Sequence, residues 1–369
     1  MTQRTYPLTF RPEETAFVMQ CWSAGVSCSL VGVGSVGKSN LLKHIVSQEV
    51  QRHYRGPDAT LYIPVIIDAN LMIPLAADAS EPLRCWAGYE LLMHRLYTTL
   101  HPFDTIPQET AERFYDLYQL LHDGTNPLYV SMGLRYFELG LTLLIEQGLQ
   151  FVFLLDECEE FLLHLPPKFF QTLRGIRDMH KRSLLFLTFS RAPLPILVER
   201  MGINPAAAEA FLELLTDHVY YVGPYNEADG SAMLQEWLSR EKREVSLNTR
   251  QQIEQVTGRY AGLLRAVISI LDTPPPLEWQ TSTLDQLCKA LLMRQVVLTE
   301  CRTLWASLTP PEQYVLKAVV RLVAYQSTPE TEQIVALLIQ KRLLRLDKHQ
   351  QRLDIMPPLF NAYVLMNPD

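Results

Sequence analysis

The sequence predicts an α/β fold: a parallel five-stranded sheet, then a helical segment and a small C-terminal domain of helix, helix and hairpin. Three observations support this prediction. Short segments that are apolar on both faces alternate with helical patterns, which is typical of parallel strands covered on both sides. Two of these segments end in a glycine-rich loop or in acids, and the chain after residue 224 has no strand pattern before a short hairpin. We therefore expect a core over 1–224, a helical lid over 225–275 and a further domain over 285–369.

The composition is that of a packed protein with two or three domains. The chain has 369 residues, of which 48% are hydrophobic and 20% charged, so a disordered chain is excluded. The net charge of −7 argues against a protein that coats nucleic acid non-specifically. No apolar run reaches the roughly 18 residues of a membrane span, and Met1–Phe10 lacks the layout of a signal peptide. We expect a cytoplasmic protein without membrane contact.

The cysteines predict neither disulfides nor a metal site. The six are scattered, at 21, 28, 85, 158, 288 and 301, with no Cys-x-x-Cys pair and no histidine at ligand spacing. Reduced, buried thiols are the expected state. The nine histidines are equally dispersed, so a structural zinc ion has no ligand set.

The first elements follow the hydrophobic pattern. A strand over 27–31 leads into a glycine-rich loop and a helix over 38–52. Residues 61–68 form a second strand, and its Pro64 favours an edge position because proline cannot donate to the ladder. The crossover over 70–148 has no strand signal and holds helices over 86–100, 110–122 and 132–147. This crossover either only covers the sheet or also binds a partner.

The remaining strands run from Leu149 to Leu155, over 183–189 and over 218–224. Helices over 227–240, 249–256 and 261–271 follow, and Pro274–Pro276 form a stiff break. The last segment has two helices that begin with Thr-Pro, over 309–325 and 328–341, and two short strands, over 343–346 and 352–355. Helix, helix, hairpin is the order of a winged helix.

The glycine-rich loop has the spacing of a phosphate-binding loop. Gly32 to Ser39 fits G-x-x-x-x-G-K-[ST], in which backbone N–H groups surround the phosphates. Lys38 would neutralise the β- and γ-phosphates, Ser39 would ligate Mg²⁺, and the helix N-terminus adds positive charge. The predicted nucleotide-binding residues are Gly32, Val33, Gly34, Ser35, Val36, Gly37, Lys38, Ser39, Asn40 and Ser190.

A dinucleotide site is the alternative, since Gly32 to Gly37 also fit G-x-G-x-x-G. That site needs an acid roughly 20 positions after the glycines. The first acid that closes the next strand is Asp68, which is too far on, and Lys38 and Ser39 would be unexplained. The longer motif is therefore favoured.

Acidic residues follow the strand that ends at Leu155. At the carboxyl end of a strand beside the loop, Asp156 would hold Mg²⁺ through water. Glu157 would polarise an attacking water, and Glu159 is the alternative base. The competing interpretation is a strand that simply meets solvent through a charged turn.

Four side chains are candidate sensors of the terminal phosphate. The hydroxyl of Ser190, or that of Thr188, follows the next strand. Arg191 would sense charge, or it pairs with a surface acid. Arg265, one turn into the helix over 261–271, would reach the phosphates, or it is solvated.

The C-terminal domain is a poor candidate for reading DNA. Its second helix, over 330–340, begins with acids, where base and phosphate contacts usually lie. Positive charge appears only at Lys341, Arg342, Arg345, Lys348 and Arg352. We therefore favour protein contact through this domain over DNA binding.

Together, the motifs resemble those of AAA+-related P-loop ATPases of the replication-initiator and STAND branches. The resemblance covers nearly the whole chain and rests on Gly32–Ser39, Leu155-Asp156-Glu157, Thr188-x-Ser190-Arg191 and Gly262-Leu263-Leu264-Arg265.

The resemblance implies Walker A at Gly32–Ser39, Walker B at Asp156 and Glu157, a first sensor at Ser190 or Arg191, and a second at Arg265. It also implies a lid and a winged helix that move with the nucleotide state, and assembly into rings or partial rings. The sequence departs from the pattern at Cys158 and has no clear arginine finger, with Arg200 as the candidate.

The leading functional hypothesis is a nucleotide-driven switch. ATP and Mg²⁺ bind between the sheet and the lid, and slow hydrolysis resets a conformation that a protein partner reads through the winged helix or the crossover. The catalytic candidates are Lys38, Glu157, Arg191 and Arg265, and the metal ligands are Ser39 and Asp156. The alternatives are a DNA-associated loader or transposition regulator, with nucleotide-dependent homo-oligomers, and a nucleotide-binding scaffold without turnover.

Overall fold

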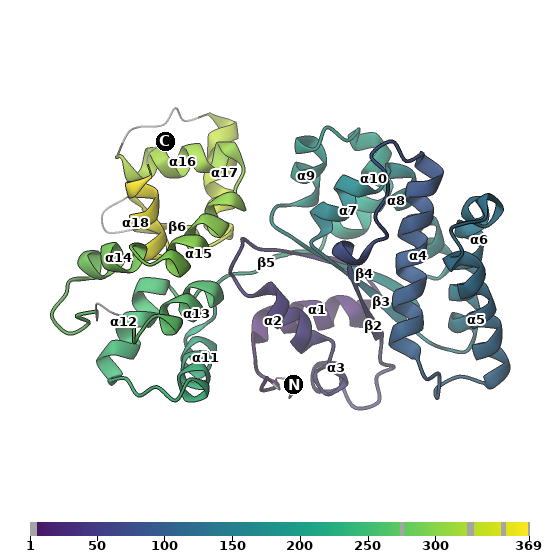
Figure 1. Ribbon diagram of the computed structural model, residues 1–369, viewed down its shortest axis with the longest axis horizontal. Helices are drawn as coiled ribbons and strands as arrows, with labels where there is room; N and C mark the ends of the chain where they lie inside the picture. The colour runs from purple at the N-terminus through teal and green to yellow at the C-terminus, as the bar shows by residue number, and fades with distance from the viewer. Residues whose placement is uncertain (1–5, 274–276, 323–327, 348–351, 368–369) are drawn as a thin grey trace. The chain divides into compact units, whose positions relative to one another are not determined.

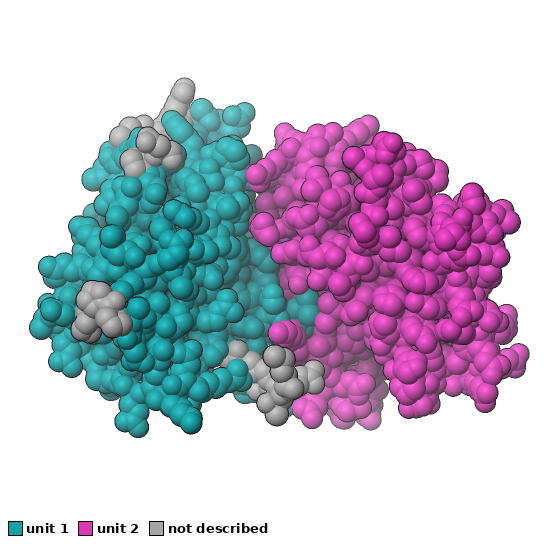
Figure 2. Space-filling model, in the orientation of Figure 1, with its two compact units in different colours: residues 1–12, 32–42, 221–369 teal, residues 13–31, 43–220 magenta. Residues whose placement is uncertain are grey.

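The computed structural model describes residues 6–273, 277–322, 328–347 and 352–367. The chain forms two compact units, which Figure 2 distinguishes by colour. Unit 1 comprises Met1–Pro12, Gly32–Leu42 and Tyr221–Asp369, and unit 2 comprises Glu13–Val31 and Lys43–Tyr220. The domain boundaries expected after residues 224 and 275 stay predictions, and the proline break at 274–276 lies outside the described residues.

Unit 2 is built on a five-stranded sheet with the order β2-β3-β4-β1-β5 (Figure 1). The strands are β1 Cys28–Val31, β2 Ile63–Asp68, β3 Phe151–Asp156, β4 Leu184–Ser190 and β5 Val219–Tyr221. The pairs β2–β3, β3–β4 and β4–β1 are parallel. The edge position of β2 confirms the prediction made from Pro64.

Helices cover this sheet and fill the crossover. They are α1 Pro12–Ala24, α3 Gln48–Arg55, the 3₁₀ helix η1 Ala69–Leu71, α4 Glu81–Leu100, α5 Gln108–His122, α6 Pro127–Glu146, α7 Cys158–His164, α8 Pro167–Met179, α9 Leu194–Arg200 and α10 Pro205–Thr216. The three long crossover helices α4, α5 and α6 pack against one another, and α4 also contacts β2. The crossover is helical, as predicted.

Within the described residues, α6 is the one helix that is long and apolar enough to cross a membrane, judged by length and composition alone. Only 28% of its most apolar window is buried. The helix packs against α4 and α5, and a core helix of a soluble protein meets the same criteria.

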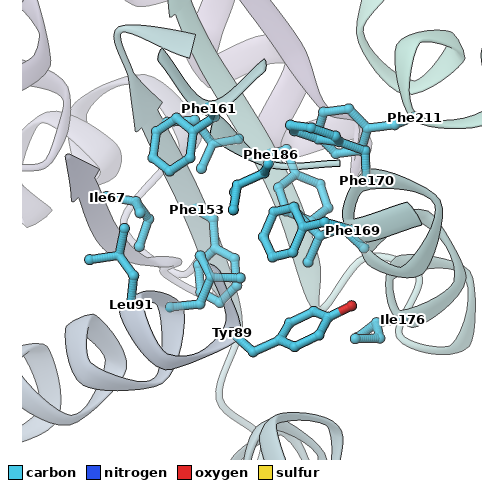
Figure 3. Packing of buried hydrophobic residues seen from close by; sticks show 14 of the residues in the cluster. Ile67, Tyr89, Leu91, Phe153, Phe161, Phe169, Phe170, Ile176, Phe186 and Phe211 are labelled. Carbon is cyan, nitrogen blue, oxygen red and sulfur yellow. The ribbon is translucent and has the colours of Figure 1, made fainter. Parts of the chain in front are cut away.

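Aromatic side chains fill the core of unit 2 (Figure 3). Phe153 of β3 and Phe186 of β4 meet edge to face with their ring centroids 6.0 Å apart, and Phe186 contacts Phe211 of α10 at 5.3 Å. All three rings are buried, and burial of such a ring stabilises the fold by about 2–3 kcal/mol. This packing holds β3 and β4 firmly, and the predicted acids and sensors follow these two strands.

The helices of unit 1 include those of the predicted lid and of the predicted C-terminal domain. They are α2 Lys38–Ile45, whose last residues belong to unit 2, α11 Glu227–Arg240, α12 Leu247–Thr257, α13 Ala261–Ser269, α14 Leu284–Leu292, α15 Gln295–Ala306, α16 Pro310–Val320, α17 Pro329–Gln340 and α18 Pro358–Met366. The strands β6 Leu344–Asp347 and β7 Arg352–Ile355 form an antiparallel hairpin. The predicted order of helix, helix and hairpin is confirmed.

Several elements differ from the sequence prediction. The helix expected over 38–52 is two helices, because Ser47 adopts an extended conformation and precedes α3; serine favours such helix ends. The sequence prediction also lacked α9, α10, α14 and α15, although Asn204 before Pro205 and the capping box of Thr283 mark the starts of α10 and α14. The predicted end of α16 at Tyr325 lies outside the described residues.

A buried ion pair removes one residue from the basic group expected in the C-terminal domain. The Lys341 ammonium lies 2.6 Å from the Glu312 carboxylate, and both side chains are almost fully buried. Breaking such a pair costs about 3–5 kcal/mol. Arg345 and Arg352 both lie beside Asp354, at 3.7 and 3.0 Å, and Lys348 lies outside the described residues.

His44 of α2 predicts a loss of stability in mild acid. Burial lowers the pKa of His44 from 6.5 to about 4. Protonation therefore favours the unfolded chain, so stability is complete above pH 6.5 and falls as the pH drops toward 4. Between pH 7.5 and 5.0 this residue should cost on the order of 2 kcal/mol.

Urea unfolding of the wild type and His44→Gln at these two pH values measures this cost. The variant should lose less stability than the wild type over this interval, by about that amount. Equal losses in the two proteins would show that His44 does not carry the effect.

Candidate functional site

The acids predicted to hold metal and activate water lie at the carboxyl ends of neighbouring strands. Asp156 ends β3 and is in register with Asp68, which ends β2. Glu157 follows with a left-handed backbone conformation, φ 51°, and precedes α7. A non-glycine residue rarely adopts this conformation, and such strain is concentrated at functional sites.

Polar groups on both sides hold the Glu157 carboxylate. The Asn70 side-chain amide of η1 donates to one oxygen at 3.3 Å, and the Arg191 guanidinium donates to the other at 3.4 Å. The Glu157 backbone N–H donates to Asp156 at 3.0 Å. The carboxylate is therefore oriented, and with 42% of the side chain exposed it is open to solvent.

Arg191 pairs with both candidate bases. Its guanidinium lies 3.2 Å from Glu159 as well as 3.4 Å from Glu157. The expectation that Arg191 pairs with a nearby acid describes this arrangement, and its role as a charge sensor stays a prediction. Glu159 is buried, whereas Glu157 is partly exposed, so Glu157 is the more accessible of the two bases.

The two candidate hydroxyl sensors are buried in the sheet. Thr188 donates to Ser29 of β1 at 2.9 Å, and Ser190 donates to the Ala192 carbonyl at 2.8 Å. Ser190 is in register with Val31, the last residue of β1. The Thr188 hydroxyl therefore links β4 to β1, and the Ser190 hydroxyl stabilises the turn after β4. Contact of either hydroxyl with a phosphate stays a prediction.

The loop that is predicted to bind phosphate belongs to unit 1. The side chain of its lysine contacts backbone carbonyls of the same loop. The Lys38 ammonium donates to the carbonyls of Gly32 and, at 3.2 Å, of Val33. Ser35 at the tip has a left-handed conformation, φ 62°. The Ser39 side chain is exposed, as a hydroxyl that ligates a metal must be.

Arg11 supports the loop, and sequence reasoning missed it. Its side chain is 1% exposed and donates to the Val36 carbonyl of the loop at 2.6 Å and to the Gly223 carbonyl at 3.0 Å. The guanidinium also lies over the Tyr225 ring, 4.6 Å from its centroid. The signal in the sequence was weak, a single arginine before the first helix.

Two further predicted residues contact partners within unit 1. The Asn40 amide donates to the Tyr225 hydroxyl at 2.6 Å, so Asn40 fixes the start of α2 to the segment before the lid. Arg265 of α13 is largely exposed and lies 3.7 Å from Glu300 of α15. Arg200 is exposed at the end of α9.

The residues present fit a nucleotide with Mg²⁺. Gly32, which begins the predicted phosphate loop, directly follows Val31 at the carboxyl end of β1. The loop and the sheet that carries the acids are therefore joined by the chain itself. In the described part of the chain, no group of three or more His, Cys, Asp or Glu side chains is arranged to hold a metal. Mg²⁺ in nucleotide sites needs few protein ligands, since phosphates and water complete its shell, and Ser39 and Asp156 stay its predicted ligands.

The cysteines are as predicted. All six are free and buried. Cys158, the departure from the family pattern, is 1% exposed in the core of unit 2, where burial raises the pKa of its thiol. Its side chain packs in the core next to the acids in sequence.

Comparison with known proteins identifies the fold. No protein-family model and no curated protein matches the sequence. The Walker-type ATPase PABY2304 of Pyrococcus abyssi is similar in structure, with a TM-score of 0.53 and 15% identity over 99% of this chain and 100% of that one. Two further solved structures are similar: the Aeropyrum pernix ORC2 protein (TM-score 0.49, 11% identity, 97% and 92% coverage) and Cdc6p from Pyrobaculum aerophilum (0.44, 13%, 98% and 96%).

These likenesses establish the fold alone. The predicted fold class, an α/β fold with a parallel five-stranded sheet like that of the Walker-type ATPase, is confirmed. The helical lid and the C-terminal winged helix stay predictions. Membership of the replication-initiator or STAND branch stays a prediction.

Proposed function

We propose that this protein is an ATP-binding switch that hydrolyses ATP slowly. The observation that carries the proposal is the order of groups along one sheet edge. The phosphate loop continues β1, the neighbouring β4 ends in Ser190 and Arg191, and β3 ends in Asp156 and Glu157. In doubly wound sheets, ligands bind outside the carboxyl ends of the strands at such a point.

Each side chain has a distinct chemical task in this proposal. Lys38 exchanges its loop carbonyls for phosphate oxygens, which form stronger charge-assisted hydrogen bonds. Ser39 and Asp156 hold Mg²⁺, and the bound Mg²⁺–ATP supplies the reactive phosphoanhydride and neutralises its charge. Glu157, held by Asn70, accepts a proton from the attacking water.

The distribution of charged residues favours a protein partner over DNA. The first turn of α17 carries Glu330 and Glu332, Lys341 is buried in an ion pair, and both hairpin arginines lie beside Asp354. The basic footprint of a groove-binding helix is therefore weak. The DNA-associated loader remains the rival outcome of the experiment below.

The test is ATP turnover by the full chain, with and without duplex DNA at low salt, while light scattering follows the mass. We expect slow turnover that DNA does not change. Turnover that DNA stimulates, together with a rise in mass, would favour the loader. ATP binding without turnover would favour the scaffold, and absence of both binding and turnover would refute the proposal.

A further inference from the structure

Helix α15 lies against the phosphate-binding loop within unit 1. A Cβ atom added to Gly34 of the loop would lie 3.0 Å from the carbonyl oxygen of Thr303 on α15. A Cβ atom on Gly262 of α13 would lie 2.6 Å from the Ser35 Cβ and 2.3 Å from a carboxylate oxygen of Glu300. The loop therefore contacts α13 and α15 closely at two positions where a side chain larger than glycine would clash. Helices α13 and α15 pack side by side (Figure 1).

The carboxylate of Glu300 occupies the centre of this contact. The Ser35 hydroxyl donates to one of its oxygens, and the Arg265 guanidinium lies 3.7 Å from the other. The Ser35 carbonyl in turn accepts the Gly262 N–H at 2.9 Å. A carboxylate from the C-terminal part of the chain therefore contacts both the loop hydroxyl and the arginine that was predicted to reach the phosphates.

This arrangement brings an anion to a loop whose predicted ligand is also an anion. Two like charges a few ångströms apart near a protein surface repel each other. A triphosphate carries more negative charge than a diphosphate, so the repulsion falls more heavily on the triphosphate. A phosphate that used Ser35 or Arg265 would also have to displace the carboxylate from them.

We propose that Glu300 determines the nucleotide affinity and specificity of this site by competing with phosphate for Ser35 and Arg265, which disfavours ATP relative to ADP. The inference rests on the proposed nucleotide site and adds a residue to it. Because α15 also packs against α13, α14 and α18, release of Glu300 by a bound triphosphate would reach the C-terminal helices directly. This is the physical connection that a switch requires.

The decisive variant is Glu300→Gln, which removes the charge and keeps the size of the side chain. Titration of the full chain with Mg²⁺–ATP and Mg²⁺–ADP should show ATP affinity raised about tenfold and ADP affinity raised about threefold. Asp285→Asn is the matched control, since it removes one negative charge from α14 at a side chain that is 77% exposed and paired with Lys289. The control should leave both affinities unchanged.

Other outcomes separate this inference from the proposed function. If the wild type binds ATP and Glu300→Gln binds it no more tightly, the inference is wrong and the nucleotide site stands. If neither protein binds nucleotide, both fail. Glu300→Ala, with its unfolding midpoint measured in parallel, should also raise ATP affinity; a fall in ATP affinity with the fold intact would show that the Ser35 contact only supports the loop.

Discussion

Replacing Lys38 by alanine should lower the affinity for ATP between about tenfold and about a hundredfold. A charge-assisted hydrogen bond contributes about 1.5–3 kcal/mol, and every 1.4 kcal/mol changes affinity about tenfold. In the wild type the ammonium donates to the carbonyls of Gly32 and Val33 in the loop, and phosphate oxygens would take the place of these carbonyls. Calorimetric titration with Mg²⁺–ATP measures the effect.

Lys43→Ala is the matched control for this experiment. Lys43 is an exposed lysine on the same helix, five residues after Lys38, and its loss removes the same charge. ATP affinity should stay near the wild-type value. If Lys38→Ala binds ATP as tightly as the wild type, the assignment of the phosphate loop is wrong, and the proposed function is wrong with it.

Replacing Glu157 by glutamine should reduce ATP turnover by about two to three orders of magnitude while ATP still binds. Glutamine keeps an oxygen that accepts the hydrogen bond of Asn70, but it cannot take a proton from water. The measurement is single-turnover hydrolysis next to a binding titration, because only the pair of experiments separates chemistry from affinity.

Two further variants identify the base. Glu160→Gln changes a carboxylate three residues further on, at a position that pairs with His164 at 3.7 Å, and it should retain turnover. Glu159→Gln tests the alternative base. A loss of turnover in Glu159→Gln but not in Glu157→Gln would move the catalytic role to Glu159, and full turnover in both would leave hydrolysis without a base.

The sheet was predictable because its signals are local. Strands that are apolar on both faces, a proline at an edge and acids after Leu155 can all be read within a few residues, and the structure has β2 at the edge and Asp156 at the end of β3. The spacing of Gly32 to Ser39 likewise predicts a phosphate-binding loop, and this assignment stays a prediction. What these signals did not predict was the break between α2 and α3 and the short helices α14 and α15.

The supporting residues could not be predicted because their partners are distant in sequence. Arg11 bonds to Gly223, 212 residues away, and Ser35 bonds to Glu300, 265 residues away. Neither contact leaves a pattern in the neighbouring residues. Arg265 shows the same limit, since its position in α13 was expected but its pairing with Glu300 was not.

The division of the chain has a consequence for how the protein matures during synthesis. Every segment of unit 2 has been made once Tyr220 is complete, so its aromatic core can form early. The loop Gly32–Leu42 is also made early, but its partners Gly262 and Glu300 are made well after Tyr220. At ~5–20 residues per second, the loop waits tens of seconds before the ribosome delivers them, so a nascent chain holds a formed sheet well before it holds a supported phosphate loop.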